Sequence, residues 1–126
     1  MMPRESLLVV DDDASLNELY RLELEEEGYR VRSASSGPEA LALLGKEPAD
    51  LVVLDIRMEG MDGLDTLGEI LKVRRELPVV INTAYSNFKT DFGTWSADAY
   101  VVKSADLTEL KTRIREVLRR RRPRAA

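Results

Sequence analysis

The chain has 126 residues, of which 44% are hydrophobic and 33% charged, and its formal net charge is −4. This length suits one compact domain, and no apolar stretch approaches the roughly 20 residues that a transmembrane helix needs. The absence of cysteine and histidine excludes disulfides, thiolate or imidazole catalysis and cysteine-held zinc or iron–sulfur sites. The remaining metal ligands are oxygen atoms, which favour magnesium, calcium or manganese.

The predicted elements alternate between strands and helices along the whole chain. In chain order we predict a strand over residues 7–10, a helix over 14–27, a strand over 29–34, a helix over 38–46, a strand over 51–54, a helix over 64–75, strands over 79–81 and 100–102, and a helix over 107–121. Gly28 and Pro38 mark the end of the first helix and the start of the second. Asp13 directly precedes the first helix, and we expect it to cap that helix.

The predicted strands consist of continuous Val, Ile and Leu, which is typical of strands that are buried on both faces. Such strands separated by helices specify a mostly parallel sheet covered on both sides, which is a three-layer α/β sandwich. We find no internal repeat and no second domain in the sequence. A single domain of the α/β class is therefore predicted.

The two ends of the sequence carry little information about function. The start, Met-Met-Pro-Arg-Glu-Ser, has no apolar run typical of a signal peptide, so we expect a cytoplasmic protein that is not attached to a membrane. The net negative charge argues against direct binding of nucleic acid. The basic segment 119–126, with five arginines, is interpreted as a flexible helix end and linker; a binding patch for an acidic partner is the alternative.

Polar side chains follow four of the five predicted strands. Asp11 and Asp12 follow the first strand, Asp55 the third, Thr83 the fourth and Lys103 the fifth. In parallel sheets of this kind the ligand site lies beyond the carboxyl ends of the strands. Each residue alone has an ordinary structural explanation, such as a helix cap, a turn or a solvated lysine. Their convergence on one edge favours a functional site.

This combination of side chains suits phosphoryl transfer. Magnesium is typically held by one or two carboxylates together with waters and phosphate oxygens, which fits Asp11 and Asp12. A further carboxylate, Asp55, can attack phosphorus and become an aspartyl phosphate. Negative charge spreads over the phosphoryl oxygens in the transition state, so the Lys103 ammonium and the Thr83 hydroxyl would stabilise it.

Short segments around these residues form a specific set. They are Leu-Val-Val-Asp-Asp-Asp at 8–13, Val-Leu-Asp-Ile-Arg-Met at 53–58 with Met-Asp-Gly at 61–63, Asn-Thr-Ala at 82–84 and Ala-Tyr-Val-Val-Lys at 99–103. With this set the chain resembles the receiver domain of two-component response regulators over nearly its whole length. The resemblance implies a flavodoxin-like receiver fold over residues 1–122, with five parallel strands in the order 2-1-3-4-5.

The resemblance also implies roles for the residues at the strand ends. Asp55 would accept a phosphoryl group from the phosphohistidine of a histidine kinase, or from a phosphotransfer protein. Asp11, Asp12, Asp55 and the backbone carbonyl of Arg57 would bind Mg²⁺, and Lys103 would contact the phosphoryl group. The chain contains no histidine of its own, which agrees with a donor on a partner.

Thr83 and Tyr100 would form the switch pair of such a domain. The charge of a new phosphate would attract the Thr83 hydroxyl, and the vacated space would admit the Tyr100 ring. The face built by residues 85–98, the strand 100–102 and the helix 107–121 would change and engage a downstream target, an output domain or a second copy of the chain. No DNA-binding or catalytic output domain follows in this sequence, so we expect another protein to receive the signal, unless the chain is a fragment of a larger regulator cut in the arginine-rich linker.

Three features depart from the family's usual pattern. Residues 85–98 are rich in Ser, Asn, Thr and Gly and predict at most two helical turns or an irregular segment. Ser104 stands where proline is usual, so the peptide bond before it is expected to be trans with an adjusted loop; a strained cis bond enforced by the active site is the alternative. Glu59 also stands where proline is common, and with Arg57 and Tyr85 it is expected to tune the lifetime of the phosphate.

Two other functions fit part of this pattern. A magnesium-dependent phosphatase of the haloacid-dehalogenase type also forms an aspartyl intermediate, but Asp55-Ile56-Arg57 lacks the second carboxylate of the Asp-x-Asp pair that such enzymes use. A pseudo-receiver binds proteins without being phosphorylated, and its usual mark is the loss of acidic or lysine positions, which this chain retains. The sequence therefore favours a signalling domain over an enzyme.

Overall fold

The computed structural model describes residues 4–56, 63–84 and 97–121, which contain a single five-stranded sheet. The elements are β1 (Ser6–Val10), α1 (Ala14–Glu26), β2 (Arg30–Ala34), α2 (Gly37–Lys46), β3 (Leu51–Leu54), α3 (Gly63–Val73), β4 (Val79–Thr83), β5 (Ala99–Val102) and α4 (Thr108–Arg121). All neighbouring strands are parallel, in the order β2-β1-β3-β4-β5. The three-layer sandwich and the strand order predicted from the sequence are confirmed.

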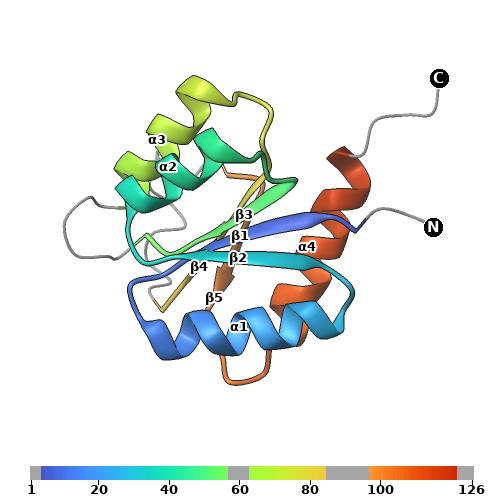
Figure 1. The fold of residues 1–126 in the computed structure, drawn as a ribbon. Coiled ribbons are helices and arrows are strands. Elements are labelled where there is room, and N and C mark those ends of the chain that lie inside the picture. Colours follow the sequence, from blue (N-terminus) through green and yellow to red (C-terminus); the bar gives the residue numbers. More distant parts are fainter. Residues whose placement is uncertain (1–3, 57–62, 85–96, 122–126) are drawn as a thin grey trace.

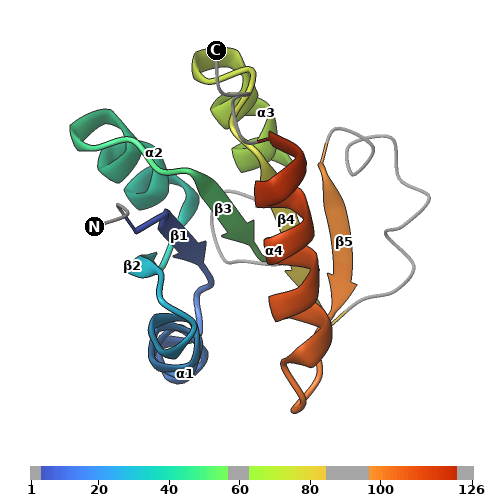
Figure 2. The same ribbon diagram turned by 90° about the vertical axis from the view of Figure 1, so that its right-hand side faces the viewer.

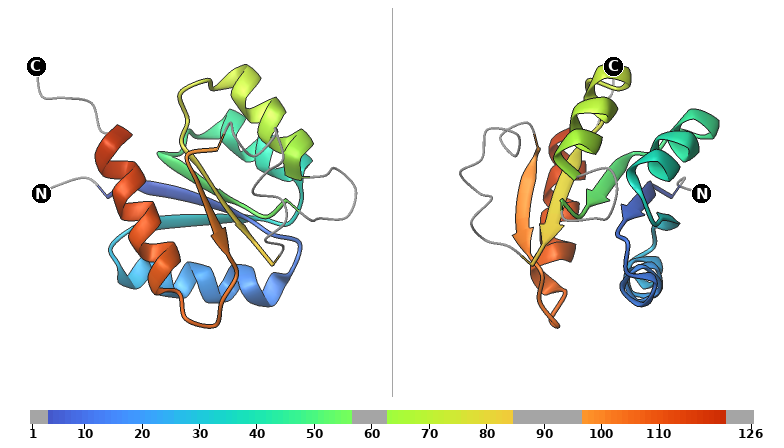
Figure 3. Two further views of the ribbon diagram at one scale, coloured as in Figure 1. Left: turned by 180° about the vertical axis from the view of Figure 1, so that it is seen from behind. Right: turned by 90° about the vertical axis from the view of Figure 1, so that its left-hand side faces the viewer.

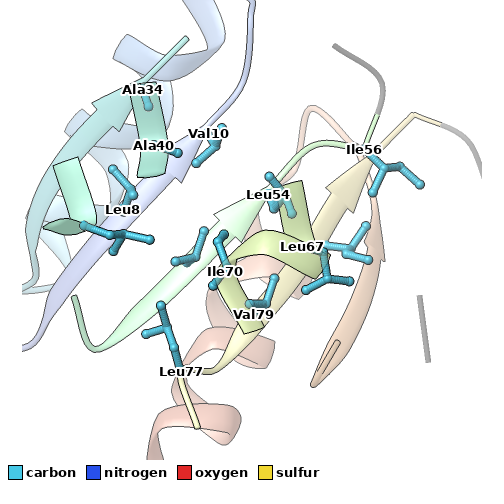
Figure 4. Packing of buried hydrophobic residues seen from close by; sticks show 13 residues of the cluster. Leu8, Val10, Ala34, Ala40, Leu54, Ile56, Leu67, Ile70, Leu77 and Val79 are labelled. Carbon is cyan, nitrogen blue, oxygen red and sulfur yellow. The ribbon is translucent and has the colours of Figure 1, made fainter. Parts of the chain in front are cut away.

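The sheet separates two apolar cores, because side chains of a strand alternate between its faces. Leu8 and Val10 of β1 pack toward α2 and α3, whereas Leu7 and Val9 pack toward α1 and α4. Figure 1 shows α2 and α3 together on one side of the sheet and α1 on the other, and Figures 2 and 3 show the same layers from further directions. Figure 4 shows the cluster on the α2–α3 side, where Ile70 and its neighbours cover the central strands.

Strand β4 is longer than its apolar run predicts. The sequence pattern ends at Ile81, but the strand continues to Thr83 because Asn82 and Thr83 pair with Val101 and Val102 of β5. Both polar residues are buried, at 3% and 0% exposure. Thr83 therefore lies inside the sheet, at the last position of its strand, and is not part of a loop.

The helix boundaries follow the signals in the sequence. The Asp13 side chain caps the start of α1, as predicted, and Gly28 follows the end of this helix with a φ of 102°. Only glycine adopts such a backbone angle without strain. Helix α2 begins with Ser36 as its cap and Pro38 in its first turn. These ends place the β1–α1 turn and the β2–α2 turn at the carboxyl edge of the sheet.

Some predictions lie outside the described residues. The prediction of a short or irregular helix over 85–98 falls almost wholly in 85–96, and the end of the basic tail falls in 122–126. Helix α4 includes residues 119–121, so the first part of that basic segment is helical. Among the described residues, no helix combines the length and the apolarity that crossing a lipid bilayer demands.

Candidate functional site

The carboxyl ends of β1, β3, β4 and β5 bring four predicted site residues to one edge of the sheet. Asp11 directly follows β1, Asp55 follows β3, Lys103 follows β5, and Thr83 is the last residue of β4. The Asp55 backbone N–H donates a hydrogen bond to Val10, and the Lys103 N–H donates one to Thr83, so the strand pairing itself fixes their relative positions. Convergence of these residues was predicted from the sequence.

Lys103 joins the two buried carboxylates of the site. Its Nζ lies 2.7 Å from Asp11 Oδ2 and 2.9 Å from Asp55 Oδ2. The two carboxylate side chains are only 3% and 7% exposed, and the lysine side chain is 18% exposed. Charge-assisted contacts of this length in a largely buried place are strong, and they hold all three groups in fixed positions.

The pKa values of this cluster reflect both burial and pairing. Burial raises the pKa of the Asp11 carboxyl, and the hydrogen bond from Lys103 opposes that rise only in part. Burial alone would lower the pKa of the Lys103 ammonium. Its hydrogen bonds to Asp11 and Asp55 outweigh burial and hold that pKa above its ordinary 10.5. Lys103 is therefore a permanent positive charge at neutral pH.

Three carboxylates form a possible cation site at this edge. Asp11, Asp12 and Asp55 each offer one oxygen, and these oxygens all lie within 4.8 Å of one another. Two of the residues are buried and Asp12 is exposed, so the cluster faces solvent on one side. An oxygen-only set with one open side suits Mg²⁺, which keeps several waters and binds through one or two carboxylates. The residues present therefore fit the predicted cofactor.

The three adjacent aspartates divide into two roles. The Asp11 carboxylate accepts a hydrogen bond from the Asp13 N–H at 2.9 Å, which tightens the turn after β1. The Asp13 carboxylate accepts hydrogen bonds from the N–H groups of Ser15 and Leu16. Asp13 thus caps helix α1, whereas Asp11 and Asp12 belong to the carboxylate cluster.

Two alanine variants should separate these roles. Asp13→Ala is expected to lower the free energy of unfolding by about 1 kcal/mol through loss of the cap, with Mg²⁺ affinity nearly unchanged. Asp12→Ala is expected to weaken Mg²⁺ binding by about tenfold or more with little loss of stability. Urea unfolding and calorimetric titration measure the two quantities. A larger loss of Mg²⁺ affinity in Asp13→Ala than in Asp12→Ala would contradict this division of roles between the aspartates.

Mg²⁺ affinity should also depend on pH through Asp11. Only the ionised carboxylate can bind the cation, and burial sets the pKa of Asp11 above the ordinary 3.8. As pH falls through that raised value, protons compete with Mg²⁺, and affinity should drop by up to about tenfold per pH unit. Calorimetric titrations at decreasing pH test this. An affinity that stays constant until the pH reaches 3.8 would contradict it.

Thr83 and Tyr100, the predicted switch pair, lie on the α2–α3 side of the sheet. Tyr100 is half-buried and packs against the core cluster there, opposite Ile81 of β4. Thr83 is fully buried, and its Oγ1 makes no hydrogen bond with any of the described residues. A buried hydroxyl without a partner costs free energy. The Thr83 hydroxyl can therefore gain a hydrogen bond when an acceptor group enters the site.

Three predicted tuning positions, Arg57, Glu59 and Tyr85, lie outside the described residues, and so does the Arg57 carbonyl as a metal ligand. The peptide bond between Lys103 and Ser104 is trans, as expected for a residue other than proline.

Gly63, Asn17 and Tyr20 lie next to the site, although no site role was predicted for them. Gly63 begins α3, and a Cβ there would lie 2.4 Å from the carbonyl oxygen of Asp55. Asn17 and Tyr20 are buried polar residues on the inner side of α1. The sequence signals were the Met-Asp-Gly motif for Gly63 and, for Asn17 and Tyr20, polar atoms at positions of α1 that face the core.

Comparisons with known proteins agree with this geometry. The family model of the response regulator receiver domain matches residues 7–115. The chain therefore belongs to the receiver domains of two-component systems, and the resemblance noted from its motifs is confirmed.

Individual relatives are regulators of transcription. The chain is 39% identical over 121 residues to the "Probable transcriptional regulator ycf27" of Porphyridium aerugineum, covering 94% of this chain and 50% of the relative. It is 48% identical over 81 residues to the "Transcriptional regulatory protein GlrR" of Escherichia coli K12, covering 64% of this chain and 18% of the relative. The chain thus spans half or less of the length of these two relatives.

Solved structures of receiver domains have the same fold. Response regulator TrrA of Thermotoga maritima, solved in complex with Mg²⁺-BeF, is 42% identical with a TM-score of 0.87, covering 90% of this chain and 98% of that one. The CheY-like receiver domain protein of Methanospirillum hungatei is 29% identical with a TM-score of 0.89, covering 94% and 97%. TrrA was also solved in complex with the histidine kinase ThkA.

Proposed function

We propose that this chain is a phosphorylation-dependent signalling switch whose phosphoacceptor is Asp55. The observation that carries the proposal is the Lys103 ammonium, which lies 2.9 Å from the Asp55 carboxylate beside the three-carboxylate cluster. A carboxylate nucleophile, a fixed positive charge and a set of cation ligands are the groups that phosphoryl transfer requires. A cap explains Asp13 and a turn explains one hydrogen bond of Asp11, but neither role accounts for the contacts of Lys103 with Asp11 and Asp55.

The proposed reaction transfers a phosphoryl group from a histidine of a kinase or phosphotransfer protein. An Asp55 carboxylate oxygen attacks phosphorus, a P–O bond forms, and the P–N bond of the phosphohistidine breaks, leaving the electron pair on the imidazole nitrogen. Mg²⁺ held by Asp11, Asp12, Asp55 and the Arg57 carbonyl would neutralise the charge of the phosphoryl oxygens. Lys103 would exchange its contact with Asp55 for a contact with the phosphoryl group.

Thr83 would complete the switch. Its buried hydroxyl has no hydrogen-bond partner among the described residues, and phosphoryl oxygens would be acceptors for it. Its displacement would give room to the Tyr100 ring on the same side of the sheet. The face that includes β5 and α4 would then shift between two arrangements, and the downstream target or a second copy would recognise one of them.

The partners are proposed from relatives. The solved complex of TrrA with ThkA, in which TrrA is 43% identical to this chain with a TM-score of 0.85, supports a histidine kinase as the phosphoryl donor. The transcriptional regulators among the relatives support an output in gene control through a further domain or protein. A cytoplasmic location and a homodimer stay predictions.

A small phosphodonor tests the proposed function without knowledge of the kinase. The protein is incubated with acetyl phosphate, with Mg²⁺ or with a chelator, and its intact mass is measured. One phosphoryl adduct that forms with Mg²⁺ and not with the chelator is the expected result. Absence of an adduct under both conditions would indicate a pseudo-receiver. Continuous release of phosphate from many phosphate esters would indicate a phosphatase.

A further inference from the structure

Helix α1 carries two buried polar side chains one turn apart on its inner side, Asn17 and Tyr20. They are 7% and 2% exposed, and the helix otherwise buries apolar side chains such as Leu24 there. A buried polar group costs free energy unless it is hydrogen-bonded, so the partners of such groups indicate what they do. Neither residue takes part in the proposed phosphoryl transfer.

Asn17 fastens the turn that presents the cation ligands. Its Nδ2 donates hydrogen bonds to the carbonyl of Asp11, at 2.7 Å, and to the carbonyl of Ala34, at 3.2 Å. The Asp11 N–H also donates to Ala34, so three hydrogen bonds connect the end of β1, the end of β2 and α1. Asp12 is the next residue along the chain. The direction of both predicted ligands therefore depends on this turn.

The amide oxygen of Asn17 indicates that asparagine does not give the highest stability at this position. Its Oδ1 is buried and has no hydrogen-bond partner among the described residues. An unpaired buried oxygen destabilises the folded state, and a leucine of similar size would avoid that cost. What asparagine offers at this position is the Nδ2 donor to the Asp11 carbonyl.

Tyr20 lies in the same core cluster as Val80 of β4 and Val101 of β5. Burial raises the pKa of its hydroxyl, and an interaction with the side chain of Asn82 opposes that rise. Asn82 is 3% exposed and precedes Thr83 at the end of β4. Asn82 pairs with Val101 of β5, two residues before Lys103. Tyr20 thus packs helix α1 against the end of β4 that carries Thr83.

We propose that Asn17 and Tyr20 are positioning residues for the two halves of the site. Asn17 holds the β1–α1 turn so that Asp11 and Asp12 can share a cation, and Tyr20 holds the end of β4 so that Thr83 can meet a phosphoryl group. Neither side chain is one of the proposed ligands of the cation or one of the proposed contacts of the phosphoryl group. The inference rests on the proposed function of the site and goes beyond it in naming what orients its parts.

The test measures Mg²⁺ and a phosphoryl analogue separately. Each variant is titrated calorimetrically with Mg²⁺ alone and then with beryllofluoride at saturating Mg²⁺, where beryllofluoride stands for the phosphoryl group on Asp55. Asn17→Leu should weaken Mg²⁺ binding roughly tenfold. Tyr20→Phe, which removes only the hydroxyl, should leave Mg²⁺ affinity within about twofold and weaken beryllofluoride binding about fivefold. Tyr29→Phe, at a half-buried tyrosine elsewhere, should change neither affinity.

The two affinities distinguish positioning from general destabilisation. Unfolding curves confirm that each variant is folded, and Asn17→Ala replaces Asn17→Leu if the latter does not fold. Wild-type Mg²⁺ affinity in the Asn17 variant, or an equal loss of both affinities in Tyr20→Phe, would overturn the inference while leaving the proposed function intact. A wild-type protein that binds neither Mg²⁺ nor beryllofluoride would overturn both.

Discussion

Replacement of Gly63 by alanine is expected to destabilise the protein by about 3 kcal/mol and to disturb the phosphoacceptor. Gly63 is the first residue of α3 and donates its N–H to the carbonyl of Ile56. A Cβ at this position would lie 2.2 Å from Ile56 Cα and 2.4 Å from the carbonyl oxygen of Asp55. These are backbone atoms, which cannot rotate aside as a side chain could. Either the start of α3 or the backbone of Asp55 and Ile56 must therefore shift.

Gly68 offers a matched control in the same helix. A Cβ at Gly68 meets no atom within 4 Å, so alanine there should increase stability by up to about 1 kcal/mol through its better helix propensity. Urea unfolding of both variants measures the difference, and the yield of the acetyl phosphate adduct reports on Asp55. Equal stability of the two variants would refute the close approach of α3 to the residue after β3.

Replacement of Lys103 by methionine is the second change with a large expected effect. In a chelating buffer it should lower the free energy of unfolding by about 3 kcal/mol, because it leaves two buried carboxylates, Asp11 and Asp55, without their counter-charge. Mg²⁺ should restore much of this stability, since the cation brings its own positive charge to the same oxygens. Mg²⁺ should also bind more tightly to Lys103→Met than to the wild type, because no ammonium competes with it for the carboxylate oxygens.

Lys111→Met provides the comparison for this lysine. Lys111 is about as exposed as Lys103, at 22% against 18%, and its Nζ lies 2.8 Å from Glu23 Oε1. Its partners Glu23 and Glu27 are a third or more exposed, so their charges remain hydrated when the lysine is removed. A loss below about 1 kcal/mol is expected, with no response to Mg²⁺. Similar losses of stability in Lys103→Met and Lys111→Met would contradict the inference that burial of its carboxylate partners makes Lys103 the more important lysine.

The fold was predictable from the sequence because its central strands, β1, β3 and β4, contain continuous buried apolar runs. Continuous Val, Ile and Leu runs are typical only of strands covered on both faces, so the layer architecture followed from the pattern alone. The end of β4 did not follow. Asn82 and Thr83 are polar, so the sequence pattern did not predict them as buried strand residues. The strand includes them because they pair with Val101 and Val102 of β5.

The candidate site was predictable for a different reason. Parallel strands place their carboxyl ends at one edge, so Asp11, Asp55 and Lys103 could be expected together before any distance was known. The supporting residues could not. The importance of Gly63 depends on how closely α3 approaches the loop after β3, and the roles of Asn17 and Tyr20 depend on which carbonyl or amide each meets across the core. Such contacts are tertiary and leave no periodic signal in the sequence.

The most direct test of the central claim is the intact mass of Asp55→Asn beside the wild type after incubation with Mg²⁺ and acetyl phosphate. The substitution keeps the size of the side chain and removes the nucleophilic carboxylate. We expect one phosphoryl adduct on the wild type and none on Asp55→Asn. A wild type that stays unmodified, or an adduct that persists in Asp55→Asn, would contradict the assignment of Asp55 as the phosphoacceptor.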